Sequence, residues 1–186
     1  MEKSLRILYI ILFFGLMLNC HKRAVTTAVQ MGQTNAKIPD VILYDFSYHF
    51  TSKGRSVWVL SSQKADVFRD EDLIKVDGVH LIFYQNGKPD TIVDARFGEV
   101  KEKEKILSAM SNVILRTHDN SILKTEILHW NDSTAKLYTD EFVMITRPNG
   151  DVIQGYGMEA DNNLEKMIIK KRVKGLLYEK KKDEKM

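Results

Sequence analysis

The stretch VHLIFYQNG (residues 79–87) sets the architecture, because the same pattern returns twice further along the chain. The later copies are VILRTHDNS (113–121) and VMITRPNGD (143–151), and a further interval of 30 residues leads to Val173. In each copy, alternating apolar residues run into a polar turn, which is the pattern of a half-buried strand that ends in a hairpin. A repeat of about this length predicts a fold that grows by stacking, in which each unit buries its apolar face against its neighbours.

Strand-like alternation continues on both sides of these copies. Phe46, Tyr48 and Phe50 alternate with polar residues, and Asp77-Gly78 is typical of a turn just before the first copy. From Val79 onward we expect about three short strands in each repeat. Because side chains of a strand point alternately to its two faces, one face of the resulting sheet is apolar and the other is wet. The sequence therefore predicts an all-β, antiparallel fold.

The N-terminal residues have the pattern of an export signal. Lys3 and Arg6 precede an apolar run at 7–18, which is shorter than the ~20 residues that a membrane-spanning helix needs. Cys20, the only cysteine, follows where a lipoprotein signal places its lipidated residue. The same segment also fits an uncleaved signal anchor. In both cases we expect the rest of the chain to be periplasmic and tethered to the inner membrane.

This organisation divides the chain into four parts. We expect a lipoprotein signal peptide or signal anchor at 1–20, a flexible tether at 21–40, a β domain at 41–178 and a charged tail at 179–186. The tether shows no apolar period, whereas the tail is rich in lysine and glutamate.

Composition excludes several classes of protein. The formal net charge is only +3, so no nucleic-acid-binding surface is indicated. A single cysteine excludes an internal disulfide framework. With 44% apolar residues, the chain can bury a core without such covalent links.

Catalytic and metal-binding patterns are weak. His118, Asp119 and Ser121 offer the residue types of a hydrolytic triad, but they fall in a predicted hairpin turn, where Asp and Asn serve backbone geometry. The acidic run at 70–72 is more typical of a turn than of half a metal site, and no two histidines have ligand spacing. We therefore expect no enzyme, no cofactor and no metal.

Several strings of the chain, taken in order, resemble the LptC family of membrane-tethered periplasmic proteins of lipopolysaccharide export. The likeness runs from about Phe46 to Tyr178. It is carried by FTSKGRSVWVLSSQKADV (50–67), TIVDARFGEV (91–100), LKTEILHWNDSTAKLYTDEFVMI (123–145) and GDVIQGYGMEADNNLEKMIIKKRVKGLL (150–177). The chain departs from many members of that family at Cys20, since those members keep a membrane-spanning helix.

The resemblance implies a β-jellyroll whose two sheets open into a V-shaped trough for the acyl chains of lipopolysaccharide. It also implies partners, namely an ABC transporter of the inner membrane that supplies the lipid and an LptA-like periplasmic bridge protein that receives it. The bridge protein would pair with an open sheet edge, for which residues 166–178 are the candidate. Two alternatives are a structural envelope lipoprotein that binds protein partners without lipid, and an LptA-like bridge component.

The candidate lipid-binding residues are the inward-facing apolar side chains of the predicted strands. Among them, the resemblance implies that Val76, Val173 and Leu177 line the trough. We expect the trough to be left unfilled by the protein's own side chains. The full set is Phe46, Phe50, Trp58, Leu60, Val76, Leu81, Phe83, Val93, Leu107, Leu115, Leu123, Leu137, Ile145, Val173 and Leu177.

Overall fold

The structure is a computed structural model that describes residues 37–178 of the 186. The predicted signal at 1–20, most of the predicted tether at 21–40 and the tail at 179–186 lie outside the described residues. Within the described part, no helix is long and apolar enough to cross a membrane.

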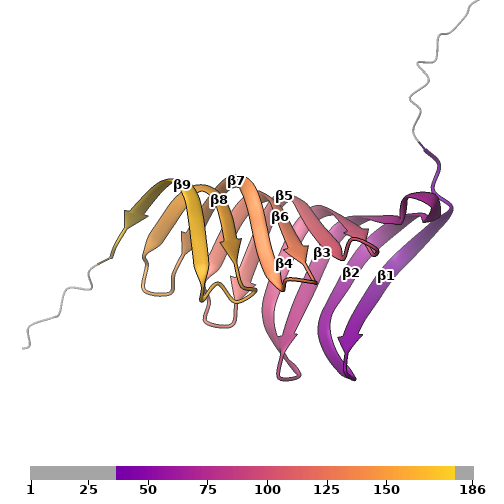
Figure 1. The fold of residues 1–186 in the computed structure, drawn as a ribbon, viewed down its shortest axis with the longest axis horizontal. Coiled ribbons are helices and arrows are strands. Elements are labelled where there is room, and N and C mark those ends of the chain that lie inside the picture. Colours follow the sequence, from indigo (N-terminus) through magenta and orange to yellow (C-terminus); the bar gives the residue numbers. More distant parts are fainter. Residues whose placement is uncertain (1–36, 179–186) are drawn as a thin grey trace, which may run out of the picture. The chain divides into compact units, whose positions relative to one another are not determined.

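In residues 37–178, nine antiparallel strands form one sheet, in which every strand pairs with its neighbours in sequence, from β1 at one edge to β9 at the other (Figure 1). This confirms the all-β prediction. A single-turn 3-10 helix, η1 (Arg69–Glu71), follows the second strand. The strands are β1 (Val41–Ser52), β2 (Arg55–Phe68), β3 (Leu73–Gln85), β4 (Lys88–Lys101), β5 (Ile106–Thr117), β6 (Ile122–Asn131), β7 (Lys136–Thr146), β8 (Val152–Ala160) and β9 (Met167–Leu176).

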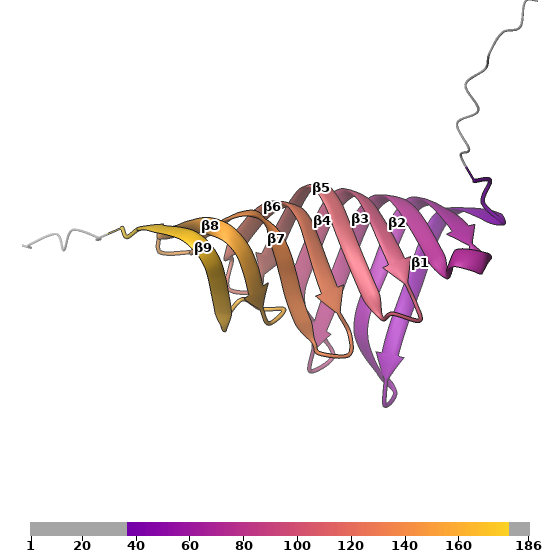
Figure 2. The ribbon, with the colours of Figure 1, turned by 45° about the horizontal axis from the view of Figure 1, so that its top comes forward.

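The strands are long and bent, and the sheet folds over on itself (Figures 1 and 2). Bulges mark the bend, because the pairing register shifts in mid-strand in β4, β5, β6, β7 and β8. A bulge adds an unpaired residue that bends its strand and increases its twist. The two facing layers are therefore two halves of one sheet.

The repeat contains two long strands and not three short ones, so this prediction was wrong. Val79, Val113, Val143 and Val173 lie in the middle of β3, β5, β7 and β9. The expected turn at Asp77-Gly78 lies inside the continuous strand β3, where Gly78 has φ +75° and the pairing register with β2 and β4 is the same on both sides of it. A turn and a local distortion within a strand can both place a glycine in the left-handed region, so the same local signal serves either structure.

Apolar ladders cross each half of the folded sheet and face each other. The first half-sheet comprises the strand segments next to the turns near residues 53, 86, 119 and 149, and the second comprises those next to the turns near 70, 103, 133 and 163. In the first half, register partners run from Leu60 through Leu81, Val93, Leu115 and Leu123 to Ile145. In the second half they run from Ile74 through Val100, Leu107, Trp130 and Leu137 to Ala160. Each fully buried Leu, Ile or Val stabilises the fold by about 1.5–3 kcal/mol.

Candidate lipid-binding site

The structure gathers the candidate lipid-binding residues into one cluster between the two half-sheets. Phe46 and Phe50 are partly buried and pack against this cluster. Val173 and Leu177, in contrast, are 56% and 80% exposed at the β9 end. The fully enclosed members are Trp58, Leu60, Val76, Leu81, Phe83, Val93, Leu107, Leu115, Leu123, Leu137 and Ile145.

The space between the half-sheets is filled by the protein's own side chains along the middle of the described sheet. The cavity there measures only ≈ 20 Å³ and is lined by residues such as Leu60, Val93 and Leu107. A cavity of that size holds about one water molecule, whereas an engineered cavity that binds benzene measures about 150 Å³. The interior is therefore filled at these residues, in contrast to the open furrow expected from the sequence.

The hairpin turns at the ends of the two half-sheets contact each other. They close the gap between the half-sheets on that side, which we call the mouth. Trp58 Nε1, in the first half-sheet, donates a hydrogen bond to Asp132 Oδ1 in the second, at 3.4 Å. Trp130 Nε1 donates to the same oxygen at 3.4 Å, and the Trp130 ring packs on Phe83 with centroids 4.8 Å apart. One carboxylate and two indoles thus hold the two sides of the mouth together.

A second contact across the mouth lies at the β1 end. Burial raises the pKa of Tyr48 to about 12, with a further contribution from its hydrogen bond to Glu102, which lies in the turn between β4 and β5. The Tyr48 ring stacks on Trp58 at 5.4 Å, and Phe50 stacks on the same indole at 5.3 Å. These aromatic side chains border a hollow of ≈ 60 Å³. The mouth is therefore mostly aromatic at this end of the sheet.

Arg147 makes a third contact across the mouth, at the end of β7. Its Nη1 donates to Ser121 Oγ at 3.2 Å, and its Nη2 donates to the Leu164 carbonyl oxygen at 2.9 Å. Leu164 belongs to the β8–β9 turn, which is part of the opposite half-sheet. The guanidinium therefore joins two turns that are distant in sequence.

The triad-like residues serve a turn, as expected from the sequence. Asp119 accepts hydrogen bonds from the Ser121 amide at 3.0 Å, from the Ser121 hydroxyl at 3.0 Å and from the Thr117 hydroxyl. These bonds, led by the one from Thr117, lower the pKa of Asp119. His118 instead contacts Asp90, with 3.1 Å between Nδ1 and Oδ1. No imidazole is positioned beside the serine among these residues.

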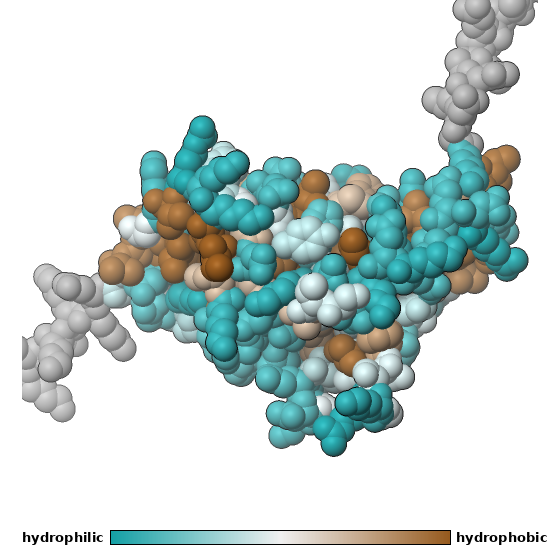
Figure 3. Space-filling view, in the orientation of Figure 1, coloured by the Kyte–Doolittle hydropathy of each residue, from teal (hydrophilic) through white to brown (hydrophobic). Residues whose placement is uncertain are grey.

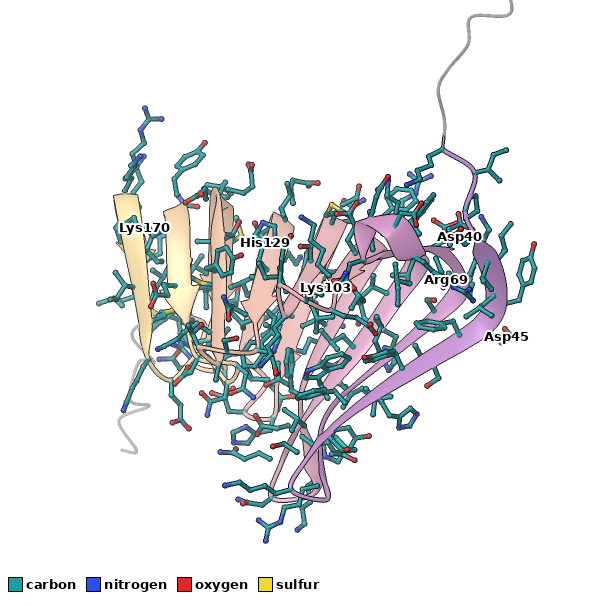
Figure 4. The ribbon with its side chains drawn as sticks, turned by 45° about the vertical axis from the view of Figure 1, so that its right-hand side comes forward. Asp40, Asp45, Arg69, Lys103, His129 and Lys170 are labelled. Carbon is teal, nitrogen blue, oxygen red and sulfur yellow. The ribbon has the colours of Figure 1, made fainter. Side chains whose placement is uncertain are left out.

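The acidic run at 70–72 forms the η1 turn. Asp72 has φ +54°, and its carboxylate accepts a hydrogen bond at 2.6 Å from the amide of Lys103, a residue that is labelled in Figure 4. Within residues 37–178, no group of three or more His, Cys, Asp or Glu side chains could hold a metal ion.

The two ends of the folded sheet expose unpaired strand edges together with apolar side chains. Within residues 37–178, β1 and β9 each pair with a single neighbouring strand, and Asp45 and Lys170 mark these opposite edges (Figure 4). On β9, Ile168 and Leu176 are 67% and 75% exposed, and apolar surface covers this end of the sheet (Figure 3). Sheet edges of this kind are templates for pairing with another chain.

Sequence reasoning missed the aromatic and polar contacts of the mouth. Trp130 is 5% exposed and continues the inward alternation of Leu128, so the period of two could have identified it. Asp132 carried no such signal, because its role depends on an indole 74 residues away.

Comparisons with known proteins agree with this architecture. The fold is similar to the crystal structure of LptH, the LptA-homologous periplasmic component of the lipopolysaccharide transport device from Pseudomonas aeruginosa. The TM-score is 0.51 at 8% sequence identity, and the match covers 66% of this chain and 95% of LptH. At this identity the likeness concerns the fold alone. A comparison with curated proteins found no match.

The family comparison covers nearly the whole chain. Residues 7–179 match the model of a family described as lipopolysaccharide-assembly, LptC-related. Proteins of this family are periplasmic and anchored at the inner membrane. The chain therefore belongs to the LptC family, and its role lies in lipopolysaccharide transport.

Proposed function

We propose that this protein shelters the acyl chains of lipopolysaccharide between its two half-sheets and relays the lipid across the periplasm. The supporting observation is the apolar interior, which runs without interruption from β2 to β8 and ends at two open edges. Each CH₂ group removed from water contributes about 0.8 kcal/mol, so even partial shelter of several acyl chains retains the lipid. The relay requires no covalent step, and we propose that the protein is not an enzyme.

Since the interior is filled, the half-sheets must separate to admit hydrocarbon. Among the described residues, the polar contacts that close the mouth are those of Asp132, Glu102 and Arg147. A typical hydrogen bond contributes only about 0.5–1.5 kcal/mol net, so the burial of a few CH₂ groups offsets its loss. The core residues then exchange contacts with each other for contacts with acyl chains, which are equally apolar. The bulged bend is the natural axis for this opening.

The direction of transfer follows from the two open edges. We propose that an ABC transporter of the inner membrane supplies the lipid and that an LptA-like bridge protein accepts it at 166–178. An added strand would hydrogen-bond to the free edge of β9 and extend the apolar interior into the next protein. The exposed Val173 and Leu177 would then be covered at the junction.

Photo-crosslinking tests the lipid-binding proposal, with neighbouring positions on β1 as probe and control. A photoreactive phenylalanine analogue at Phe50, which packs against the core, should form an adduct with lipopolysaccharide in cells. The same analogue at His49 is the matched control, because adjacent side chains of a strand point to opposite faces. Equal adducts at both positions, or none at either in a folded protein, would favour a scaffold that carries no lipid.

We also propose that Cys20 is acylated and holds the protein at the inner membrane. A multiply acylated cysteine gains about 0.8 kcal/mol per buried CH₂, which gives firm attachment. Cys20→Ala should therefore move the protein from the membrane fraction to the soluble periplasmic fraction. If fractionation of this variant is unchanged, the N-terminal segment is a signal anchor instead.

A further inference from the structure

Three consecutive cationic side chains on β9 line a single hollow beside the edge of the sheet. The hollow measures ≈ 350 Å³. Its lining comprises Asp140, Tyr156, Gly157, Lys170, Lys171 and Arg172. Three cations and one carboxylate give this lining a formal charge of +2 (3 − 1).

A bulge explains why consecutive residues meet in the same hollow. In a regular strand, the side chain of Lys171 would point away from those of Lys170 and Arg172. Here the pairing between β8 and β9 shifts after Gln154, and Arg172 takes φ +51°. A bulge with a left-handed residue re-aims side chains in this way.

The neighbouring strand, β8, leaves room for one cation and orients another. Gly157 has φ +68°, and a Cβ at that position would lie 3.1 Å from Lys170 Cδ, so glycine leaves room for the lysine stem. The Arg172 guanidinium lies over the Tyr156 ring, 5.6 Å from its centroid. Such cation–π contact orients the guanidinium without neutralising its charge.

The one carboxylate of the lining is a weak partner that an anion could replace. Lys170 Nζ and Asp140 Oδ1 are 3.4 Å apart, and the Asp140 side chain is 92% exposed. Exposed ion pairs of this kind contribute little, typically below about 1 kcal/mol. The charge of the hollow is thus available to a ligand.

We infer that this hollow binds a phosphate group carried by the transported glycolipid, an inference that rests on the proposed function. A phosphate monoester carries about −1.5 to −2 charge at pH 7, which matches the formal charge of the lining, and Arg and Lys are the side chains that bind it best. The exposed apolar side chains at the β9 end, such as Val173, form an apolar rim beside the hollow. Val173 directly follows Arg172, and its Cα lies 3.4 Å from where a Cβ on Gly155 would be. Since β9 is an edge strand, a lipid leaving the interior can place its phosphate on the cations while its acyl chains contact the rim. The ligand class is therefore an acylated phosphosugar.

Two double variants of the full-length protein test this inference in detergent solution. Lys171→Gln with Arg172→Gln removes two charges from the hollow. Lys166→Gln with Lys174→Gln removes the same charge from the same region but outside the lining, and serves as the matched control. The probes are lipopolysaccharide with its phosphates intact, the same lipid after enzymatic dephosphorylation, and inorganic phosphate.

The hollow variant should lose roughly tenfold in affinity for the phosphorylated lipid and keep its affinity for the dephosphorylated lipid, since two charge-assisted contacts are lost. The control variant should change by less than about twofold, because charges exposed elsewhere are screened by solvent. An equal loss in the control, or an equal loss with dephosphorylated lipid, would overturn the inference.

Failure of the proposed function is recognised separately, because the wild-type protein would then bind neither form of the lipid. In that case inorganic phosphate becomes the probe, and its effect on the NMR signals of Lys171 and Arg172 decides the outcome. Saturable shifts that vanish in the hollow variant would show that the hollow binds phosphate from a source other than this lipid. The absence of shifts would show that the hollow is not a phosphate site.

Discussion

Val173→Arg should nearly abolish the cross-linking of lipopolysaccharide to the protein while the domain stays folded. Val173 is 56% exposed on the edge strand β9, so an arginine there keeps its charge in water and should change stability by no more than about 0.5 kcal/mol. In the lipid-bound state, however, the charge would stand where acyl chains pass between neighbouring proteins. Desolvating it there costs several kcal/mol, which is enough to reduce binding by more than about 100-fold.

The positive charge added by this substitution separates the apolar contacts of the lipid from its phosphate contacts. An added cation should strengthen any binding that depends only on the phosphates, so a loss of cross-linking has to come from the apolar contacts of the lipid. A photoreactive residue at Leu177, which is exposed at the same end of the sheet, reports the adduct, and Val173→Leu, which keeps the rim apolar, is the control that should cross-link normally. Undiminished cross-linking in folded Val173→Arg would show that the acyl chains do not pass the β9 end.

Leu115→Arg should unfold the domain. Leu115 is 0% exposed and lies between Val93 and Leu123 in the central ladder. The ladder offers only aliphatic side chains there, so a guanidinium at this position would be buried without a partner. Burying an uncompensated charge costs about 4 kcal/mol or more, which is a large part of the ~5–15 kcal/mol that stabilises a typical domain.

Urea unfolding followed by circular dichroism measures this effect, and the neighbouring residue provides the control. Ile114 precedes Leu115 in β5 but points to the outer face, so Ile114→Arg should cost no more than about 1 kcal/mol. A stable Leu115→Arg protein would mean that the interior opens readily enough to expose position 115 to water. That result would contradict the closed interior described above.

The alternation of apolar residues and the turn residues could be predicted from the sequence because both are local properties. Asn86-Gly87 forms the expected hairpin turn with φ values of +53° and +75°, the backbone that this pair prefers. The inward positions from Trp58 to Ile145 form the core, since a period of two places every second side chain on the same face.

Other features depend on contacts between residues that are distant in the chain. Asp77-Gly78 is compatible with a turn or with an uninterrupted strand, and only the pairing of β3 with both neighbours decides for the strand. Likewise, whether the ladders leave a furrow depends on how far the two half-sheets approach each other, which no single strand specifies. In the sequence nothing brings the three cations of β9 together, but a shift of register against β8 directs them into one hollow.

The sequence by itself determined the antiparallel β class, the inward set of apolar residues and membership of the LptC family, because strand period, turn chemistry and the order of motifs are written along the chain. Only the tertiary structure decided that the sheet folds along a line of bulges, that its interior is closed at a mouth held by Trp58, Asp132 and Arg147, and that β9 carries a cationic hollow. The physical reason is that register, close packing and cross-layer hydrogen bonds join residues 17 to 74 positions apart, and such pairings have no local signature.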